Sequence, residues 1–301
     1  MTAMGILFDI QRGCTDDGPG LRTVIFFKGC PLRCAWCHNP ESKKPGPELS
    51  WEEARCLQCG RCVPRCPYGC HQLAAGGHCL DRAACTGCGA CLSPACPALS
   101  LAGHETSVEE VMGICRQDSR FYARSGGGIT LSGGEPLFQP AFALSLLQEA
   151  KTEGYHTCVE TCGHVDEEVL LSAAGHTDLF LYDYKLTDPV IHRQYTGADN
   201  RRILHNLRQL DDAGARIILR CPIIPGINDC EAHFNGIART AAGLRGLEEI
   251  QVEPYHPFGA GKATSFGTPV FRPELGMPSP EAVEGWIAAI QKHTRVPVRH
   301  A

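Results

Sequence analysis

Cysteine spacing constrains this chain more than any other feature. Fourteen of its 19 cysteines fall between Cys14 and Cys96, and eleven of those stand in three groups with two to four residues between neighbours. Thiols at such separations suit ligation of one metal centre better than pairing as disulfides. Disulfide scaffolds are typical of short secreted chains, whereas this chain has 301 residues and no secretory pattern in its first thirteen. We therefore expect metal centres, a reducing cytoplasmic location and an anaerobic setting.

The first group places Cys30, Cys34 and Cys37 within eight residues. Three thiolates hold three corners of a 4Fe–4S cube and leave one iron without a protein ligand. An open coordination position is what permits chemistry at a metal, as in catalytic zinc sites. A structural zinc site is the alternative, but it needs a fourth ligand. The nearest candidate is His38, which is adjacent to Cys37, and side chains of adjacent residues rarely bind the same metal. The spacing therefore favours an open-iron cluster.

The other two groups each hold three cysteines at two-residue spacing and a fourth that precedes proline. This run is typical of bacterial ferredoxins, in which the fourth cysteine of each run serves the other cluster. We assign one 4Fe–4S cluster to Cys56, Cys59, Cys62 and Cys96. We assign a second to Cys85, Cys88, Cys91 and Cys66. The second run has one more residue before its last cysteine, Cys96, than the first run has before Cys66. A zinc ribbon is the alternative to the two clusters, although zinc sites seldom combine this spacing with Cys-Pro.

The remaining eight cysteines lack partner spacing, and we expect them to be buried, inert thiols. They are Cys14, Cys70, Cys79, Cys115, Cys158, Cys162, Cys221 and Cys230. The stretch 50–104 is rich in Cys, Gly and Pro and poor in apolar periodicity, so metal must hold it together. We expect it to be an insert between residues 1–49 and 105–301 of one larger domain.

Outside the insert, short apolar runs alternate with helix-length segments. The predicted strands are Arg22–Lys28, Ile129–Ser132, Thr157–Thr161, Leu179–Lys185, Arg216–Ile224 and Glu249–Tyr255. The predicted helices include Pro140–Glu153, Asp166–Ala174, Asn200–Ala213 and Cys230–Leu244. Six βα units indicate parallel strands with right-handed crossovers, in a partial barrel or a doubly wound sheet. A Rossmann-type sheet would need a glycine-rich fingerprint after its first strand, which is missing.

Polar or glycine-marked clusters follow almost every predicted strand, which favours the barrel. Parallel barrels build their active sites from the loops at the carboxyl ends of their strands. The clusters begin at Cys30, Gly133, Glu160, Asp183, Arg220 and Tyr255. Six marked ends on one face would converge on one site.

The flanks of the first cysteine group resemble a known family. A Cys-x3-Cys-x2-Cys group with an aromatic residue, here Trp36, is the signature of radical S-adenosylmethionine (SAM) enzymes. The segments 17–23 (Asp-Gly-Pro-Gly-Leu-Arg-Thr) and 37–41 (Cys-His-Asn-Pro-Glu) are similar to the glycyl-radical activating enzymes, which include the pyruvate formate-lyase activator. The similarity runs from Gly18 to about His256. It implies an α/β fold, a partial (β/α)6 TIM-type barrel with an inserted ferredoxin-like di-cluster domain.

The resemblance also implies a reaction. In this family SAM binds the open iron, one electron breaks a carbon–sulfur bond, and the 5′-deoxyadenosyl radical takes a hydrogen atom from a backbone glycine of a partner enzyme. The protein would be a radical SAM oxidoreductase with three 4Fe–4S clusters. Its partner would be a glycyl radical enzyme, and flavodoxin or ferredoxin would donate electrons. The insert would relay electrons or dock partners.

Site residues carry over one at a time as implications of the resemblance. Trp36, Cys37 and His38 match the adenine side, and His256 matches a histidine near the ribose. Gly133, Gly134 and Glu135 match the turn that binds the methionyl amino group. Asp183, Tyr184 and Lys185 match a second segment, in which Lys185 would meet the methionyl carboxylate. Glu160 matches an acidic position of the family, and Arg220 matches the start of a further family segment. The catalytic set would be Cys30, Cys34, Cys37 and Lys185. Taken singly, the Gly-Gly-Glu turn, the Asp183–Lys185 pair and His256 each have an ordinary structural interpretation.

Composition limits the remaining alternatives. A net charge of -5 and a pI near 6.2 give no basic footprint for nucleic acid. No apolar run approaches the roughly 18 residues that a membrane span needs. A radical SAM maturase with another target and an electron-transfer protein remain alternatives. The sequence does not name the partner, and we expect a monomer.

Overall fold

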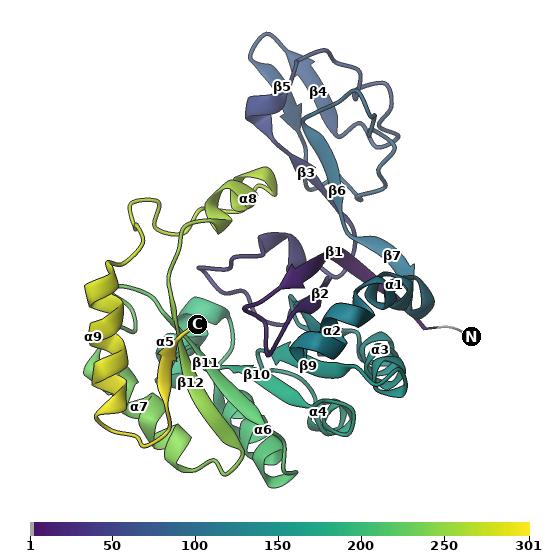
Figure 1. The fold of residues 1–301 in the computed structure, drawn as a ribbon. Helices are drawn as coiled ribbons and strands as arrows, with labels where there is room; N and C mark the ends of the chain where they lie inside the picture. Colours follow the sequence, from purple (N-terminus) through teal and green to yellow (C-terminus); the bar gives the residue numbers. More distant parts are fainter. Residues whose placement is uncertain (1–2) are drawn as a thin grey trace.

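One nine-stranded sheet organises the larger part of the chain in the computed structural model, which describes residues 3–301 (Figure 1). Its strand order is β13-β12-β11-β10-β9-β8-β2-β1-β7. The strands are β1 Met4–Cys14, β2 Arg22–Phe27, β7 His104–Ser107, β8 Gly128–Gly133, β9 His156–Thr161, β10 Leu179–Asp183, β11 Ile217–Ile223, β12 Leu247–Pro254 and β13 Val298–His300.

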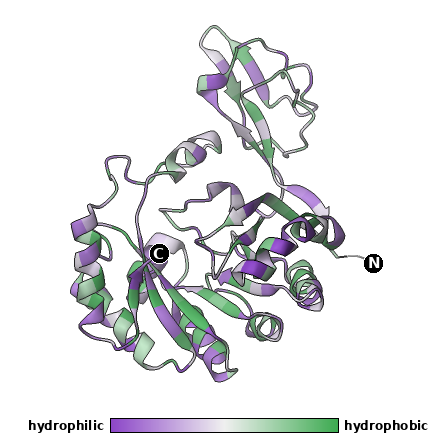
Figure 2. Ribbon diagram, in the orientation of Figure 1, coloured by the Kyte–Doolittle hydropathy of each residue, from purple (hydrophilic) through white to green (hydrophobic). Residues whose placement is uncertain are grey.

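The six predicted strands are β2 and β8 to β12, and each pairs in parallel with its neighbour, as expected. Strands buried on both faces read as near-continuous apolar runs, and all seven residues of β11 are buried. Figure 2 shows hydrophobic colour along much of the sheet, whereas β12 also carries polar residues. The sequence analysis did not anticipate β1, which pairs antiparallel with β2 and carries β7 on its other edge.

Helices lie outside the strands (Figure 1). The four predicted helices are α3 Pro140–Thr152, α4 Glu167–Ala174, α6 Arg201–Asp212 and α7 Glu231–Ala242. The others are α1 Val108–Cys115, α2 Ser119–Ser125, α5 Pro189–Thr196, α8 Gly259–Ser265 and α9 Pro280–Gln291. Local sequence explains their starts. Ser107 and Glu110 form a capping box at α1, and the Asp188 carboxylate accepts hydrogen bonds from two backbone N–H groups at α5.

The cysteine-rich segment leaves and re-enters the larger part at one place, because β3 Glu48–Trp51 pairs with β6 Leu99–Ala102. Beyond this pair, β4 His71–Ala74 and β5 Gly77–Leu80 form a hairpin (Figure 1). The segment has a small apolar cluster of its own around Leu49. It projects from the rest of the molecule (Figure 1). Among the helices of residues 3–301, none is long and apolar enough to cross a bilayer.

Polar contacts hold this segment against the larger part. The Lys28 ammonium is fully buried, and it donates to the Glu41 carbonyl and pairs with Glu48 at 2.9 Å. The Arg82 guanidinium donates to the Ser265 carbonyl at the end of α8, at 2.6 Å. A buried ammonium is stable only when it is paired in this way, so Lys28 fixes where β3 begins.

Asn228 offers a test of how the strand ends are tied together. The Asn228 side chain is 1% exposed. Its amide nitrogen donates to the Lys185 carbonyl at 2.9 Å and to the Pro222 carbonyl at 2.8 Å. Its amide oxygen accepts from the Ile224 N–H at 2.6 Å. Asn228→Ala removes the side-chain partner of three backbone groups, in two buried hydrogen bonds and one part-buried one. We expect it to lower the free energy of unfolding by about 3 kcal/mol, measured as a lower thermal midpoint.

Asn235→Ala is the matched control, because Asn235 lies on α7 where alanine favours the helix. We expect its thermal midpoint to stay close to that of the unmodified protein. Equal thermal midpoints for the Asn228 and Asn235 variants would contradict a stabilising role for the Asn228 hydrogen bonds.

Candidate active site

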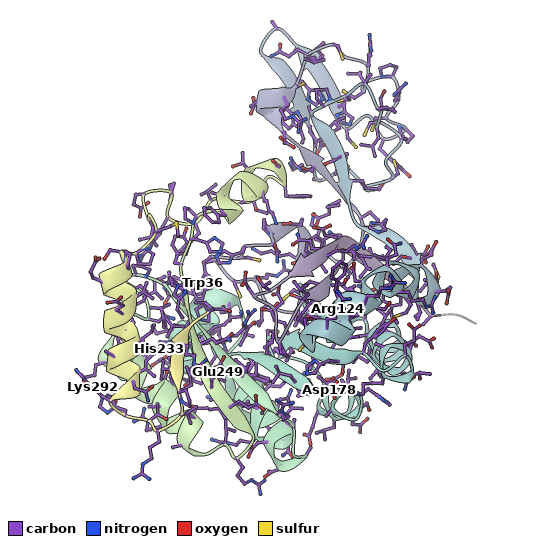
Figure 3. All side chains as sticks on the ribbon, viewed as in Figure 1. Trp36, Arg124, Asp178, His233, Glu249 and Lys292 are labelled. Atoms are coloured by element: carbon purple, nitrogen blue, oxygen red, sulfur yellow. The ribbon has the colours of Figure 1, made fainter. Side chains whose placement is uncertain are left out.

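A cavity lies at the carboxyl ends of the parallel strands. This is the place that parallel strands offer for a site. Its lining residues are Cys30, Leu32, Cys34, Trp36, Cys37, His38, Asn39, Ser42, Ser132, Gly133, Gly134, Glu160, Cys162, Asp183, Lys185, Pro222 and Glu253. In Figure 3, Trp36 lies above the strand ends, whereas Lys292 lies at the rim beside α9.

The first cysteine group brings its three thiols to this cavity. Cys30, Cys34 and Cys37 all line it, on the loop that follows β2. The loop is held from outside, because the Arg33 N–H donates to the Thr196 carbonyl at the end of α5 at 2.7 Å. Three thiols that converge from one short, anchored loop form a donor set that fits a 4Fe–4S cluster.

Burial shapes the chemistry of these thiols. It raises the pKa of Cys34 to about 12 and raises that of Cys37. The pKa of Cys30 is instead lowered, because the Cys162 thiol lies within hydrogen-bonding distance of it. Metal ligands must be deprotonated, so binding a cluster here releases protons from the two buried thiols.

Two glycines of the Gly-Gly-Glu turn allow the β8 end to approach the β2 loop. Gly133 has a φ of 112°, and a Cβ there would lie 2.3 Å from the Phe27 nitrogen. A Cβ on Gly134 would lie 2.4 Å from the Gly29 carbonyl oxygen. Only glycine fits at either position. The backbone of this turn therefore borders the cavity with no side chain in the way.

The Glu135 side chain is fully buried and lies outside the residues that line the cavity. Its carboxylate accepts hydrogen bonds from the Thr161 hydroxyl at 2.9 Å and from the Cys162 N–H at 2.8 Å. Tyr184 is also directed elsewhere, because its ring stacks on His233 with centroids 5.8 Å apart. The structure thus gives Glu135 and Tyr184 packing and hydrogen-bonding roles behind the cavity wall.

Arg220 is the centre of a buried ion network at the strand ends. It is 6% exposed and pairs with Glu160 at 2.6 Å, with Glu253 at 3.0 Å and with Asp17 at 3.7 Å. Burial, opposed by Arg220, raises the pKa of Glu253 to about 7. Burial and the nearby Glu160 raise the pKa of Asp17 to about 6. The carboxylates are oriented by the guanidinium and therefore do not swing freely toward the thiols.

Lys185 and Asp183 form a second ion pair in the cavity, at 2.7 Å, with both side chains about 85% buried. Together with the Arg220 network, two cations face four carboxylates, which leaves an excess of negative charge when all are ionised. Such a site favours a ligand that carries positive charge. The Lys185 ammonium in turn offers a partner for an anionic group of such a ligand.

Trp36 and His38 line the other side of the cavity, and both also border an adjoining hollow that His256 lines. His38 and His256 stack with centroids 3.7 Å apart, and Trp36 packs 5.9 Å from Tyr195. Burial lowers the pKa of His38 to about 4 and lowers that of His256, so both rings are neutral at pH 7. The buried nitrogens His38 Nε2 and His256 Nδ1 lack a partner within the part of the chain that the structure describes. Unpaired buried nitrogens beside flat rings fit a nucleoside.

Two ionisable residues that line this cavity, Glu253 and Cys162, were not named as site residues from the sequence. Glu253 lies at the end of β12, so the rule that strand ends carry the site could have identified it. Cys162 was expected to be an inert thiol, and it is buried, but it lies against Cys30. Its place after the Glu160–Thr161 strand end was the available signal.

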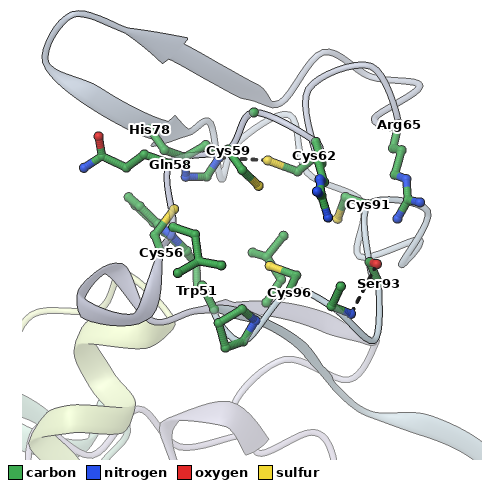
Figure 4. A pocket seen from close by; sticks show the side chains of 17 residues that line it. Trp51, Cys56, Gln58, Cys59, Cys62, Arg65, His78, Cys91, Ser93 and Cys96 are labelled. Atoms are coloured by element: carbon green, nitrogen blue, oxygen red, sulfur yellow. Dashed lines mark hydrogen bonds between the residues drawn. The ribbon is translucent and has the colours of Figure 1, made fainter.

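The insert gathers its cysteines around two hollows. Five cysteines border the first, which Figure 4 shows with Trp51 and His78: Cys56, Cys59, Cys62, Cys91 and Cys96. Five border the second: Cys66, Cys70, Cys85, Cys88 and Cys91. Each hollow therefore contains the four cysteines that the ferredoxin pattern assigns to one cluster. Cys91 borders both hollows, and Cys70, which the sequence analysis left out, borders the second.

Glu253 predicts a pH dependence of stability. Its folded pKa of about 7 lies above its ordinary value of 4.5, because burial outweighs Arg220, with Asp183, Glu160 and Lys185 also facing it. The folded state therefore binds more protons than the unfolded state between these values, and stability falls as pH rises through that window. Glu253→Gln removes this contribution. We expect the free energy of unfolding of the variant to fall less steeply from pH 5 to pH 7, by at most about 1.4 kcal/mol per pH unit, which shows as a flatter series of thermal midpoints.

The measurement is a series of thermal midpoints across that pH range for both proteins. Asp17 titrates in both and so cancels in the comparison. Parallel profiles would contradict the assignment of a raised pKa to Glu253.

Comparison with known proteins identifies both a family model and close relatives of this chain. A family model described as "4Fe-4S single cluster domain" matches residues 16–203. The isethionate sulfite-lyase activating enzyme of Oleidesulfovibrio alaskensis is 46% identical over 268 residues, which is 86% of each chain. The choline trimethylamine-lyase activating enzyme of the same organism is 40% identical over 270 residues, 87% of each chain.

Among solved structures, a radical SAM methyltransferase from Sphaerobacter thermophilus matches with a TM-score of 0.56. It is 16% identical and the match covers 98% of this chain and 76% of that one, so the likeness concerns the fold alone. The mixed α/β fold is thus that of radical SAM proteins. With the relatives above, the comparison establishes that this chain belongs to the radical SAM family of activating enzymes that generate the radical of glycyl radical enzymes.

Proposed function

We propose that the strand-end cavity holds a 4Fe–4S cluster on Cys30, Cys34 and Cys37, with its open iron turned to SAM. The observation that carries this proposal is the convergence of three thiols and the Lys185–Asp183 pair on one cavity. When bound, cluster and SAM supply the one-electron cleavage that gives a 5′-deoxyadenosyl radical for hydrogen abstraction from a backbone glycine of the partner.

The residues of the chain would bind and orient. Lys185, fixed by Asp183, receives the methionyl carboxylate, and the backbone at Gly133 and Gly134 faces the amino group. His38 and His256, with Trp36 nearby, flank the adenosine. Ligand groups held in this way approach one another in a fixed geometry, which lowers the entropic part of the barrier.

Glu160 and Arg220 would help to orient the bound ligand. The Glu160 carboxylate lines the cavity and is held by Arg220 and by the Ser132 hydroxyl. A fixed carboxylate can receive a ligand hydroxyl or ammonium without reorganisation. Glu135 and Tyr184 would support the wall through the contacts described above, and the Glu135 position would contribute backbone alone.

We further propose that residues 1–49 and 105–301 form the partial (β/α)6 barrel and that residues 50–104 form a ferredoxin-like insert with two more clusters. The outward position of the helices and the two cysteine-lined hollows support these assignments. The insert would relay electrons from flavodoxin or ferredoxin, in a monomeric cytoplasmic protein.

The partner would be a glycyl radical enzyme that cleaves the carbon–sulfur bond of a sulfonate. Support comes from two isethionate sulfite-lyase activating enzymes at 46% identity and a (2S)-3-sulfopropanediol sulfolyase activating enzyme at 45%. The choline trimethylamine-lyase relative is less similar, at 40%. Mixing the reduced protein and SAM with each type of partner, and recording the glycyl radical by EPR, would identify it. A stronger signal with choline lyase would contradict this choice.

Metal content tests the cluster proposal. The reconstituted protein should hold about twelve irons per chain, three cubes of four, and should convert SAM to 5′-deoxyadenosine with dithionite. Cys30→Ala should retain about eight irons and lose this conversion, because only the cavity cluster loses a ligand. Cys230→Ala, at an exposed thiol, is the control and should keep both properties. Four irons in the unmodified protein, or conversion by the Cys30 variant, would contradict the proposal.

Replacing one cysteine in each hollow tests the relay. Cys59→Ser with Cys88→Ser should leave SAM binding unchanged, because both residues lie in the insert. Partner activation with reduced flavodoxin should slow by at least about tenfold, whereas cleavage with dithionite should continue, because this small reductant reaches the cavity cluster directly. The rates with the two reductants are the measurement. Full activity of the variant with flavodoxin would favour a docking role for the insert.

A further inference from the structure

Two buried histidines meet in the insert beside one of the cysteine-lined hollows. His71 and His78 are 2% and 7% exposed, in a segment where most side chains are open to solvent. In the β4–β5 hairpin, His71 pairs with Leu80 and His78 pairs with Leu73. This register places the two histidines diagonally on the same face of the hairpin. The hairpin thus directs both rings inward together.

Their ring nitrogens form a short chain that ends at a cysteine. His71 Nδ1 lies 2.9 Å from His78 Nε2, and His78 Nε2 lies 3.4 Å from Cys62 Sγ, the contact drawn as a dashed line in Figure 4. Trp51 packs against the His78 ring, edge to face, with centroids 4.8 Å apart. The ring is therefore held in place from both sides with Nε2 directed at sulfur.

The surroundings decide which nitrogen of His78 carries the proton. A cluster-bound Cys62 is a thiolate and has no proton to give, so a bare Nε2 would face it lone pair to lone pair. His78 Nδ1 is buried without a partner among the residues that the structure describes. A proton on that nitrogen would leave a buried donor unpaired, which is costly. The neutral tautomer with the proton on Nε2 avoids the lone-pair contact with sulfur and leaves Nδ1 as an unpaired acceptor, which costs less than an unpaired donor. Its single proton is then shared between the Cys62 thiolate and His71 Nδ1 as a bifurcated hydrogen bond.

A separate metal site on Cys62, His71 and His78 is the rival interpretation, because their ligand atoms all lie within 4.8 Å of one another. Two nitrogens bound to one tetrahedral zinc at about 2.0–2.1 Å stand roughly 3.3 Å apart. The two histidine nitrogens are 2.9 Å apart, which is a hydrogen-bond length. The geometry therefore favours a hydrogen bond between the rings over shared coordination.

We propose that His78, oriented by His71, donates a hydrogen bond from Nε2 to the Cys62 thiolate and thereby raises the reduction potential of the cluster that Cys62 holds. Hydrogen bonds to cluster sulfurs are one of the factors that set this potential. A donor stabilises the reduced state more, because reduction adds negative charge to the sulfurs. His78 is a positioning residue for the electron relay, and this inference rests on the proposed function, since it requires clusters in the insert.

The second hollow provides an internal comparison. There the Cys66 sulfur accepts from the backbone N–H of Cys70 at 3.3 Å. A backbone donor is unaffected by side-chain substitution, so changes at His78 should leave that cluster as it is. The two clusters therefore separate a specific effect of His78 from a general disturbance of the insert.

The test is an EPR-monitored redox titration of the fully loaded protein. His78→Phe retains a ring against Trp51 and removes the donor. One insert cluster should become about tenfold harder to reduce at a given potential, a shift of about 59 mV for a one-electron couple, and the other should not move. His78→Gln, which restores an N–H donor, should recover most of the shift. Trp51→Phe disturbs the packing and not the hydrogen bond, and it should leave the midpoints nearly unchanged.

A second measurement needs no substitution. In the unmodified protein labelled with ¹⁵N-histidine, pulsed EPR of the reduced cluster should show a weak ¹⁵N coupling of the size that a hydrogen bond gives. Absence of any coupling, or unchanged midpoints in His78→Phe at about twelve irons, overturns the inference alone. A strong coupling, loss of four irons in His78→Phe, or bound zinc that this variant loses would show that His78 is a ligand and overturn it too. Only four irons in the unmodified protein would instead refute the proposed function.

Discussion

Parallel register is the constraint on which the rest of this structure depends. It sets Phe27 beside Gly133, Asp183 beside Arg220, and Pro222 beside Glu253. Residues far apart in sequence thus end their strands at one level. Because the carboxyl ends of parallel strands all open on one side, the thiol loop, the glycine turn and the ion pairs reach the same cavity without any long loop.

Charge then explains why the cavity needs a buried arginine. Four carboxylates at one edge of a sheet would repel each other and raise one another's pKa values. Arg220 offsets this by pairing with three of them, and Lys185 pairs with the fourth. The carboxylates that stay ionised can attract a cationic ligand, and the ion pairs hold these carboxylates in place. Orientation and attraction thus come from the same network.

The sequence predicted the six parallel strands and four of the helices, because buried strands and amphipathic helices leave strong periodic patterns. It did not predict β1, in which residues 11–13 are exposed, so this part of the strand lacks an apolar pattern. Site residues in short motifs, such as Cys30 and Lys185, could be named in advance. Glu253 and the His71–His78 pair could not, since their importance arises from neighbours that only the fold brings together.

The insert shows most clearly how metal and chain would depend on each other. Its apolar cluster is small, centred on Leu49, Cys91 and Leu99, and all three of these residues border the cysteine-lined hollows. A core of this size cannot offset the entropy of ordering some fifty residues. Under the proposed cluster assignment, cluster binding would supply much of the folding free energy of the segment. A buried polar pair is costly unless it is hydrogen-bonded, and a Cys62 thiolate would give His78 Nε2 an acceptor in addition to His71 Nδ1.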